Sequence, residues 1–122
     1  MGKITLKNIR CYSFHGCLKE ESIIGSDYLV NLEITADLKE SEGSDRLEDT
    51  VDYVLLNNIV KEEMAVASKL LENVAQRILS SIFKKELRVK KGVVEITKIN
   101  PPINGDVVGV SVKLTKKKEA KF

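Results

Sequence analysis

Four short segments hold the side chains best suited to acid–base chemistry. They are His15-Gly16-Cys17-Leu18-Lys19-Glu20-Glu21, Asp49-Thr50-Val51-Asp52-Tyr53, Leu70-Leu71-Glu72 and Ile96-Thr97-Lys98-Ile99-Asn100-Pro101-Pro102. Carboxylates such as Glu21 and Glu72 accept hydrogen bonds and protons, and a lysine such as Lys98 exchanges protons when its surroundings tune its pKa. Tyr53 offers a phenolic proton and a flat ring. These residues are therefore the candidates for a site that moves protons.

Each candidate has an ordinary structural explanation when it is taken alone. Glu21 is typical of a solvated loop, and Lys98 ends an apolar strand face from which its amine could reach water. Tyr53 could hold its hydroxyl at the surface, and Glu72 could favour the positive end of a helix dipole. Only the four segments together carry a functional prediction.

Alternating apolar and polar residues predict strands in the first third of the chain. Ile4 and Leu6 alternate with lysine and threonine, and this strand is expected to continue through Tyr12 and Phe14 until it breaks at Gly16. A longer alternation follows at residues 30–38, where every second residue is apolar. It indicates a strand with one buried and one solvated face, paired antiparallel with its neighbour.

The middle of the chain predicts two helices, after a polar stretch at residues 40–49. Asp52 is a suitable cap for a helix from Tyr53 to about Ala67. A second helix is expected to begin near Ser68, because apolar residues recur from there at helical spacing. The residues on this stripe are Leu71, Val74, Ala75, Ile78, Leu79 and Ile82.

Two further strands are expected at residues 94–98 and 108–114, separated by a stiff turn at 100–105 that contains Pro101 and Pro102. The order of elements predicts an α+β fold, an antiparallel four-stranded sheet with two helices on one face. Such a sheet has two open edges, which favours association with further copies of the chain.

The composition describes one folded domain. A chain of 122 residues fits a single domain, here expected to have its core at about 3–115 and a basic, solvated tail at 116–122.

The net charge of +2 is too small to indicate a nucleic-acid partner. No apolar run is long enough for a membrane span and no secretory signal is visible, so a cytoplasmic location is expected. Cys11 and Cys17 match no metal or redox spacing and are interpreted as free thiols.

Taken together, the four segments resemble those of the dihydroneopterin aldolase family. The likeness lies in a Gly-x-x-x-x-Glu loop at 16–21, a Thr-Val-Asp-Tyr helix entry at 50–53, a Leu-Leu-Glu helix start at 70–72 and a Thr-Lys-x-x-Pro-Pro-Ile turn at 97–103. It extends from about Ile4 to Leu114. The resemblance implies the tunnelling fold, in which sheets join edge to edge into an oligomeric ring. It also implies a homo-octamer of two stacked four-membered rings, with sites between subunits.

The reaction implied by the resemblance is a retro-aldol cleavage in folate biosynthesis. It splits 7,8-dihydroneopterin into 6-hydroxymethyl-7,8-dihydropterin and glycolaldehyde. The C=N bond of the dihydropterin ring can accept the electron pair, so neither a Schiff-base lysine nor a metal is required. We therefore expect no cofactor and no metal, and one histidine with two poorly spaced cysteines would make a poor zinc site.

Residue roles also follow from the resemblance. Glu72 is expected to anchor the pterin, its carboxylate accepting hydrogen bonds from the 2-amino group and the ring N3–H. The backbone around Leu71 and the segment Thr50, Asp52 and Tyr53 are expected to complete the slot. The Tyr53 ring would stack on the flat pterin.

Proton transfer is expected to involve three residues. Lys98 is expected to handle protons at the side chain and at ring N5 through a bound water, with its pKa lowered by burial or nearby charge. Tyr53 would exchange a proton with the enol intermediate, and Glu21 would orient the side-chain hydroxyls or assist Lys98. His15, the single histidine, is interpreted as part of a structural turn.

Two alternatives stay open. The first is a 2'-epimerase acting on dihydroneopterin or its triphosphate; a triphosphate would need extra cations at the pocket mouth, for which Lys19 is one candidate. The second is a non-catalytic pterin-binding ring protein. Against it, all four matched chemical positions are occupied.

Overall fold

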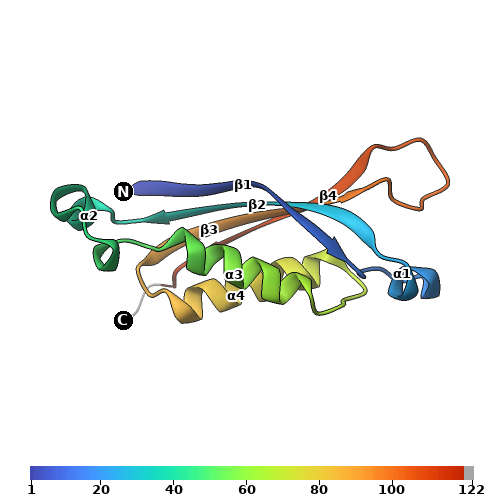
Figure 1. Cartoon of the computed structure of the whole chain (residues 1–122), viewed down its shortest axis with the longest axis horizontal. Helices are drawn as coiled ribbons and strands as arrows, with labels where there is room; N and C mark the ends of the chain where they lie inside the picture. Colours follow the sequence, from blue (N-terminus) through green and yellow to red (C-terminus); the bar gives the residue numbers. More distant parts are fainter. Residues whose placement is uncertain (120–122) are drawn as a thin grey trace.

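A computed structural model describes residues 1–119 and shows an antiparallel sheet with helices against one face (Figure 1). The strands are β1 (Gly2–Ser13), β2 (Ser26–Ala36), β3 (Val89–Ile99) and β4 (Gly109–Lys117), and they lie side by side in that order. Each pairs antiparallel with its neighbour. This confirms the predicted α+β fold with its four-stranded sheet.

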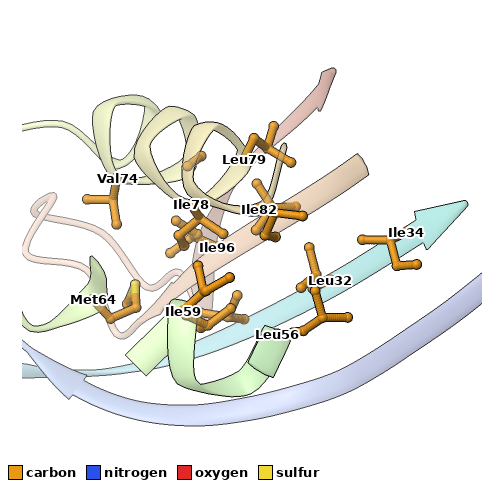
Figure 2. Packing of buried hydrophobic residues seen from close by; sticks show 14 of the residues in the cluster. Leu32, Ile34, Leu56, Ile59, Met64, Val74, Ile78, Leu79, Ile82 and Ile96 are labelled. Atoms are coloured by element: carbon orange, nitrogen blue, oxygen red, sulfur yellow. The ribbon is translucent and has the colours of Figure 1, made fainter. Parts of the chain in front are cut away.

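Two long helices connect β2 to β3 and cover one face of the sheet. They are α3 (Tyr53–Met64) and α4 (Leu71–Lys85), and they run antiparallel beside each other (Figure 1). Figure 2 shows their apolar side chains directed at those of β2 and β3, for example Ile59 and Ile78 with Leu32 and Ile96. Each fully buried aliphatic side chain of this kind contributes about 1.5–3 kcal/mol relative to an exposed one. The core thus fixes both helices on the sheet.

The first strand contains a bulge that the alternation did not predict. The pairing with β2 shifts between Leu6 and Ile9, and Asn8 has a left-handed φ of 52°. An extra residue reverses which side chains face the core. Tyr12, expected to continue the buried face, is 60% exposed, whereas Ser13 and His15 are buried. The strand ends at Ser13, before the expected break at Gly16, and Phe14 is exposed as well.

The two long helices have different bounds from those expected. Asp52 caps α3 as predicted, its Oδ1 accepting a hydrogen bond from the Val54 N–H at 2.9 Å. The helix ends at Met64 and not near Ala67. The second begins at Leu71, three residues after Ser68. Ser68 is instead held by hydrogen bonds from other segments, which favour a non-helical backbone there.

Short helices occupy segments that were expected to be irregular. One, α1 (Lys19–Ile23), follows β1. Another, α2 (Lys39–Ser44), and a 3₁₀ turn at Leu47–Asp49 lie within the polar stretch before α3. None of the three contains a buried residue, so no hydrophobic periodicity marked them.

The C-terminal lysines are more ordered than a free tail. Lys116 and Lys117 belong to β4 and pair with Gly92 and Lys91, although their side chains are exposed. Of the predicted tail at 116–122, residues 120–122 lie outside the described part of the chain. Among the described helices, none has the length and apolar character needed to cross a membrane.

Candidate active site

A cavity of about 430 Å³ lies at the end of the sheet where α4 begins. It brings together four of the predicted site residues: Glu21, Leu71, Glu72 and Lys98. The remaining wall comes from the His15 segment, the two residues before α4, the loop after β3 and strand β4. Its residues are His15, Gly16, Leu18, Lys69, Leu70, Pro101, Pro102, Ile103, Val110 and Val112. Segments far apart in the sequence therefore form one concave site.

Lys98 is the buried charged group of this site. It lies on β3 directly opposite Tyr28 of β2 and is 7% exposed. Its Nζ forms an ion pair and hydrogen bond with the Glu21 carboxylate and donates a second hydrogen bond to the His15 carbonyl oxygen at 2.9 Å. The Tyr28 ring centroid lies 5.7 Å from the same nitrogen. These contacts hold the amine in one place at the cavity wall.

The pKa of Lys98 differs from the expectation. Burial lowers the pKa of its amine, but the hydrogen bond to Glu21 and the electrostatic contribution of Tyr28 outweigh burial, so the pKa stands above its ordinary value. We expected a lowered pKa, and this was wrong. Lys98 is therefore an ammonium group at neutral pH.

Glu21 is the anionic partner. Burial raises the pKa of its carboxyl group, but hydrogen bonds from Lys98 and from the Leu18 N–H hold the pKa below its ordinary value. The Leu18 N–H donates to Glu21 Oε1 at 3.1 Å, so the carboxylate folds back over the start of α1. Opposite charges joined by a hydrogen bond in a mostly buried position stabilise one another. The pair is therefore ionised.

Gly16 makes room for this carboxylate. Its φ is 144°, a conformation that other residues rarely adopt. A Cβ atom at this position would lie 2.3 Å from the Glu21 carboxyl carbon. The Gly-x-x-x-x-Glu spacing seen in the sequence thus has a steric cause, because the Glu21 carboxylate occupies the space that a side chain at position 16 would need.

Glu72 lies at another wall, at the second residue of α4. Its side chain is exposed at the cavity rim, and Leu71 beside it is half-buried. Free N–H groups and the helix dipole at this end favour a carboxylate.

The segment Thr50, Asp52 and Tyr53 does not reach this cavity. It lies at the opposite end of α3 from the cavity, roughly 18 Å away for a helix of this length. Asp52 is used as the helix cap, and Tyr53 is 64% exposed. Within one chain the structure therefore separates these three residues from the other four.

Two contributors were missed by sequence reasoning. Tyr28 is buried below Lys98, and its hydroxyl donates to the His15 carbonyl oxygen at 3.0 Å. Extending the alternation one step back from Val30 would have found it. His15 was interpreted as a turn residue, but it lines the cavity and is 1% exposed. Only the unpredicted bulge turns it inward.

No group of three or more His, Cys, Asp and Glu side chains within residues 1–119 is arranged to hold a metal ion. Cys11 and Cys17 are free thiols, as expected. The arrangement offers a fixed ammonium, a paired carboxylate and a second, accessible carboxylate around one cavity. Such a set can bind a polar heterocycle and transfer protons on it.

Comparison with known proteins decides which heterocycle chemistry this is. The family model for dihydroneopterin aldolase matches residues 4–115. The dihydroneopterin aldolase of Streptococcus pyogenes serotype M6 is 35% identical over 120 residues, covering 97% of this chain and all of that protein. The chain belongs to the dihydroneopterin aldolase family. This confirms the predicted family and its activity as an aldehyde-lyase.

Other members of the dihydroneopterin aldolase family agree. The enzyme of Bacillus subtilis strain 168 is 31% identical over 119 residues, covering 97% of this chain and 99% of that one. The fold matches the crystal structure of the Escherichia coli dihydroneopterin aldolase in complex with neopterin with a TM-score of 0.86. That match covers 95% of this chain and 99% of the other at 16% identity. At this identity the likeness establishes the fold.

Proposed function

We propose that the cavity is the pterin site of this aldolase and that a neighbouring subunit completes it. The observation that carries the proposal is the buried Lys98–Glu21 pair, which shares one cavity with Glu72 at the start of α4. A cleavage site needs a group that fixes the ring and a proton-transfer group at the bond that breaks. The two walls of the cavity supply one of each.

The Glu72 carboxylate anchors the pterin ring. A pterin presents its 2-amino group and N3–H side by side, and a carboxylate accepts such a pair through two parallel hydrogen bonds. The exposed position of Glu72 at the cavity rim and the adjacent main chain of Leu71 support this role. The relative from Escherichia coli was crystallised with neopterin, a ligand of the same ring type.

Lys98 and Glu21 act at the side chain of the substrate. The 2'-hydroxyl passes its proton to a water in the cavity, the C1'–C2' bond breaks to release glycolaldehyde, and the electron pair moves through C6 to N5. The Lys98 ammonium, acting directly or through a water, protonates N5 in this step; its raised pKa keeps the amine protonated at neutral pH until then. The resulting enol takes at C1' the proton that the 2'-hydroxyl gave up, and N5 returns its proton to Lys98. The product is therefore 6-hydroxymethyl-7,8-dihydropterin, Lys98 is an ammonium again and no cofactor is consumed. Glu21 keeps the ammonium oriented and orients the hydroxyls.

Thr50, Asp52 and Tyr53 serve the site of a neighbouring subunit. Tyr53 is exposed and far from its own cavity, so its ring is available to stack on a pterin held by another chain. The sheet leaves β1 and β4 as open edges, which pairing between copies would close. A ring of subunits joined through these edges, stacked into an octamer, satisfies both features.

A cytoplasmic location is part of the same proposal. Cys11 and Cys17 are both free thiols, as is usual in a reducing compartment. Fractionation of cells with an antibody to this protein tests it, and recovery in a membrane or extracellular fraction would contradict it.

The test is to incubate the purified protein with 7,8-dihydroneopterin and separate the products by chromatography. Equal amounts of 6-hydroxymethyl-7,8-dihydropterin and glycolaldehyde, lost in Lys98→Ala with an intact oligomer, support the proposal. Formation of only the 2'-epimer, or turnover of the triphosphate alone, would make the epimerase the better description. Pterin binding without turnover would point to a non-catalytic ring protein. Lys19, the cation considered for a triphosphate, does not line the cavity.

A further inference from the structure

His15 joins the two walls of the cavity through its side chain and its main chain. The imidazole is 1% exposed and packs edge-on against Tyr28, with ring centroids 5.3 Å apart. Its Nδ1 accepts a hydrogen bond from the Ser68 N–H at 3.1 Å. Its carbonyl oxygen accepts hydrogen bonds from Lys98 Nζ at 2.9 Å and from the Tyr28 hydroxyl at 3.0 Å. A single residue therefore contacts both the proton-transfer amine and the segment before α4.

The ring is neutral, with its proton on Nε2. Burial lowers the pKa of His15 and the positive charge of Arg77 lowers it further; the Met64 carbonyl oxygen, which is near the ring but outside hydrogen-bond geometry, acts in the opposite direction and does not outweigh them. Because Nδ1 accepts the Ser68 N–H, the proton of the neutral ring must sit on Nε2. Within residues 1–119, Nε2 is buried and has no hydrogen-bond partner. The ring thus acts through Nδ1, as a hydrogen-bond acceptor.

Ser68 lies three residues before the start of α4 and is held from two directions. Its carbonyl oxygen accepts a hydrogen bond from the Gly16 N–H at 2.9 Å, beside the bond from its own N–H to His15. On the other side, Arg77 Nη2 donates to the Ser68 hydroxyl at 2.8 Å and to the Val66 carbonyl oxygen at 2.8 Å. These bonds fix the backbone that leads directly into Leu71 and Glu72.

We propose that His15 is a positioning residue of this aldolase. Through Nδ1 it fixes Ser68 and therefore the place where α4 begins, which positions the Glu72 carboxylate. The carbonyl oxygen of His15 holds the Lys98 amine, so the same residue sets the distance between the two groups. This inference rests on the proposed roles of Glu72 and Lys98. The physical reason is that a pterin bound at one wall must present its side chain at the other, so a small displacement between the walls weakens binding and misaligns the reacting bond.

A direct catalytic role for the ring fits the structure less well. A general base must reach the substrate with a free lone pair. The lone pair of Nδ1 is engaged by Ser68, and the ring is almost wholly buried. The Nε2–H of a neutral imidazole can donate a hydrogen bond but does not give up its proton near neutral pH.

Two isosteric substitutions separate the Nδ1 bond from the bulk of the side chain. In His15→Asn the asparagine amide oxygen can take the place of Nδ1 and accept the Ser68 N–H. In His15→Leu the leucine side chain has the same branched shape as asparagine but no hydrogen-bond acceptor. Leaving the Ser68 N–H unpaired is expected to raise the dissociation constant of a non-cleavable oxidised pterin by about tenfold in His15→Leu. In His15→Asn the constant should stay within about threefold of the unsubstituted protein.

Three further readouts complete the experiment. KM should rise with the dissociation constant while kcat changes less, the kcat–pH profile should keep its shape, and the Ser68 amide should exchange with deuterium faster in His15→Leu alone. Equal impairment of the two variants, or unchanged pterin binding in a well-folded His15→Leu, would overturn the proposal. A lost limb in the kcat–pH profile would overturn it in favour of catalysis by the ring.

Two controls keep the result interpretable. If His15→Leu does not fold, His15→Gln replaces it, because its amide lies near the Nε2 position and away from Nδ1. Glu72→Gln is measured in parallel. Unchanged pterin binding in that variant would refute the proposed role of Glu72, while a difference between His15→Asn and His15→Leu would still show that the Ser68 bond shapes the cavity.

Discussion

The two ends of helix α3 hold polar residues in contrasting ways. Beyond its Met64 end lies the cavity, where Lys98 is buried and bound to Glu21 and to a carbonyl oxygen. At its other end, Tyr53 stands exposed beside the helix cap. At the Met64 end, contacts within the chain position Lys98. At the other end, the Tyr53 side chain is exposed to solvent. The difference supports the proposal that a single chain supplies most of one site and a separate part of another.

The same contrast applies to electrostatics. The pKa of Lys98 and the pKa of Glu21 both shift away from their ordinary values in the direction that favours the ion pair. Arranging charges before the substrate arrives reduces the reorganisation needed during the reaction. Tyr53, which we propose closes over a ring bound by a neighbouring subunit, would have its surroundings completed only by assembly.

The largest expected effect is at the buried end. Lys98→Ala removes the proton donor, and kcat should fall by about a thousandfold, within the range for loss of a general acid. Lys84→Ala, an exposed lysine in the last turn of α4, should leave kcat unchanged. Product formation is measured at saturating 7,8-dihydroneopterin, and gel filtration confirms the oligomer. A kcat near that of the Lys84 variant would remove Lys98 from the mechanism.

The exposed end is tested by mixing subunits. Tyr53→Ala and Lys98→Ala should each be nearly inactive, and unfolding and refolding them together at equal concentrations should restore activity. If each site takes Tyr53 from one chain and Lys98 from its neighbour, about a quarter of the sites regain both residues. Activity is compared with each variant refolded alone. Absence of any recovery in a properly assembled mixture would place both residues in the same chain's site.

An intermediate effect is expected at the cavity rim. Glu72→Gln keeps the shape of the side chain but removes the charge, so the dissociation constant of an oxidised pterin should rise by about 10–100-fold. The kcat at saturation should change less, because Glu72 holds the ring and does not touch the bond that breaks. Fluorescence titration measures the binding. A fall in kcat with unaltered binding would contradict an anchoring role.

The smallest expected effect concerns stability. Glu21→Gln should lower the free energy of unfolding at pH 7 by about 2 kcal/mol, because the Lys98 ammonium loses its charged partner. The folded pKa of Glu21 is below its ordinary value of 4.5, so the pair's contribution is present above that pH and is lost as the pH falls through the folded pKa. On the alkaline side the raised pKa of Lys98 preserves the contribution up to its ordinary value of 10.5, and it is lost above that.

Urea unfolding at fixed protein concentration measures this difference at several pH values, with Glu20→Gln as the control. Glu20 lies next to Glu21 in α1 and is exposed. A difference between the Glu21 variant and the unsubstituted chain that does not shrink in acid would show that the ion pair is not its source.

Much of the fold could be predicted because each element follows a local pattern. The alternation at residues 30–38 and the stripe from Val74 to Ile82 match the buried faces of β2 and α4. The helix start near Ser68 was misplaced, since the bonds that hold this residue come from His15 and Gly16, more than fifty positions away. The buried face of β1 after Leu6 was also predicted wrongly. A bulge inserts one extra residue there, and an alternating pattern cannot reveal it.

The sequence by itself determined the family and the residue types of the site. Motif spacing is set by local geometry, as when Gly16 leaves room for Glu21, and such spacing is readable along the chain. Tertiary structure decided what surrounds those residues. It paired Lys98 with Glu21 and thereby raised the lysine pKa against expectation, turned His15 inward, and separated Tyr53 from the cavity. The physical reason is that pKa values, burial and distance across a cavity depend on groups brought together only by folding.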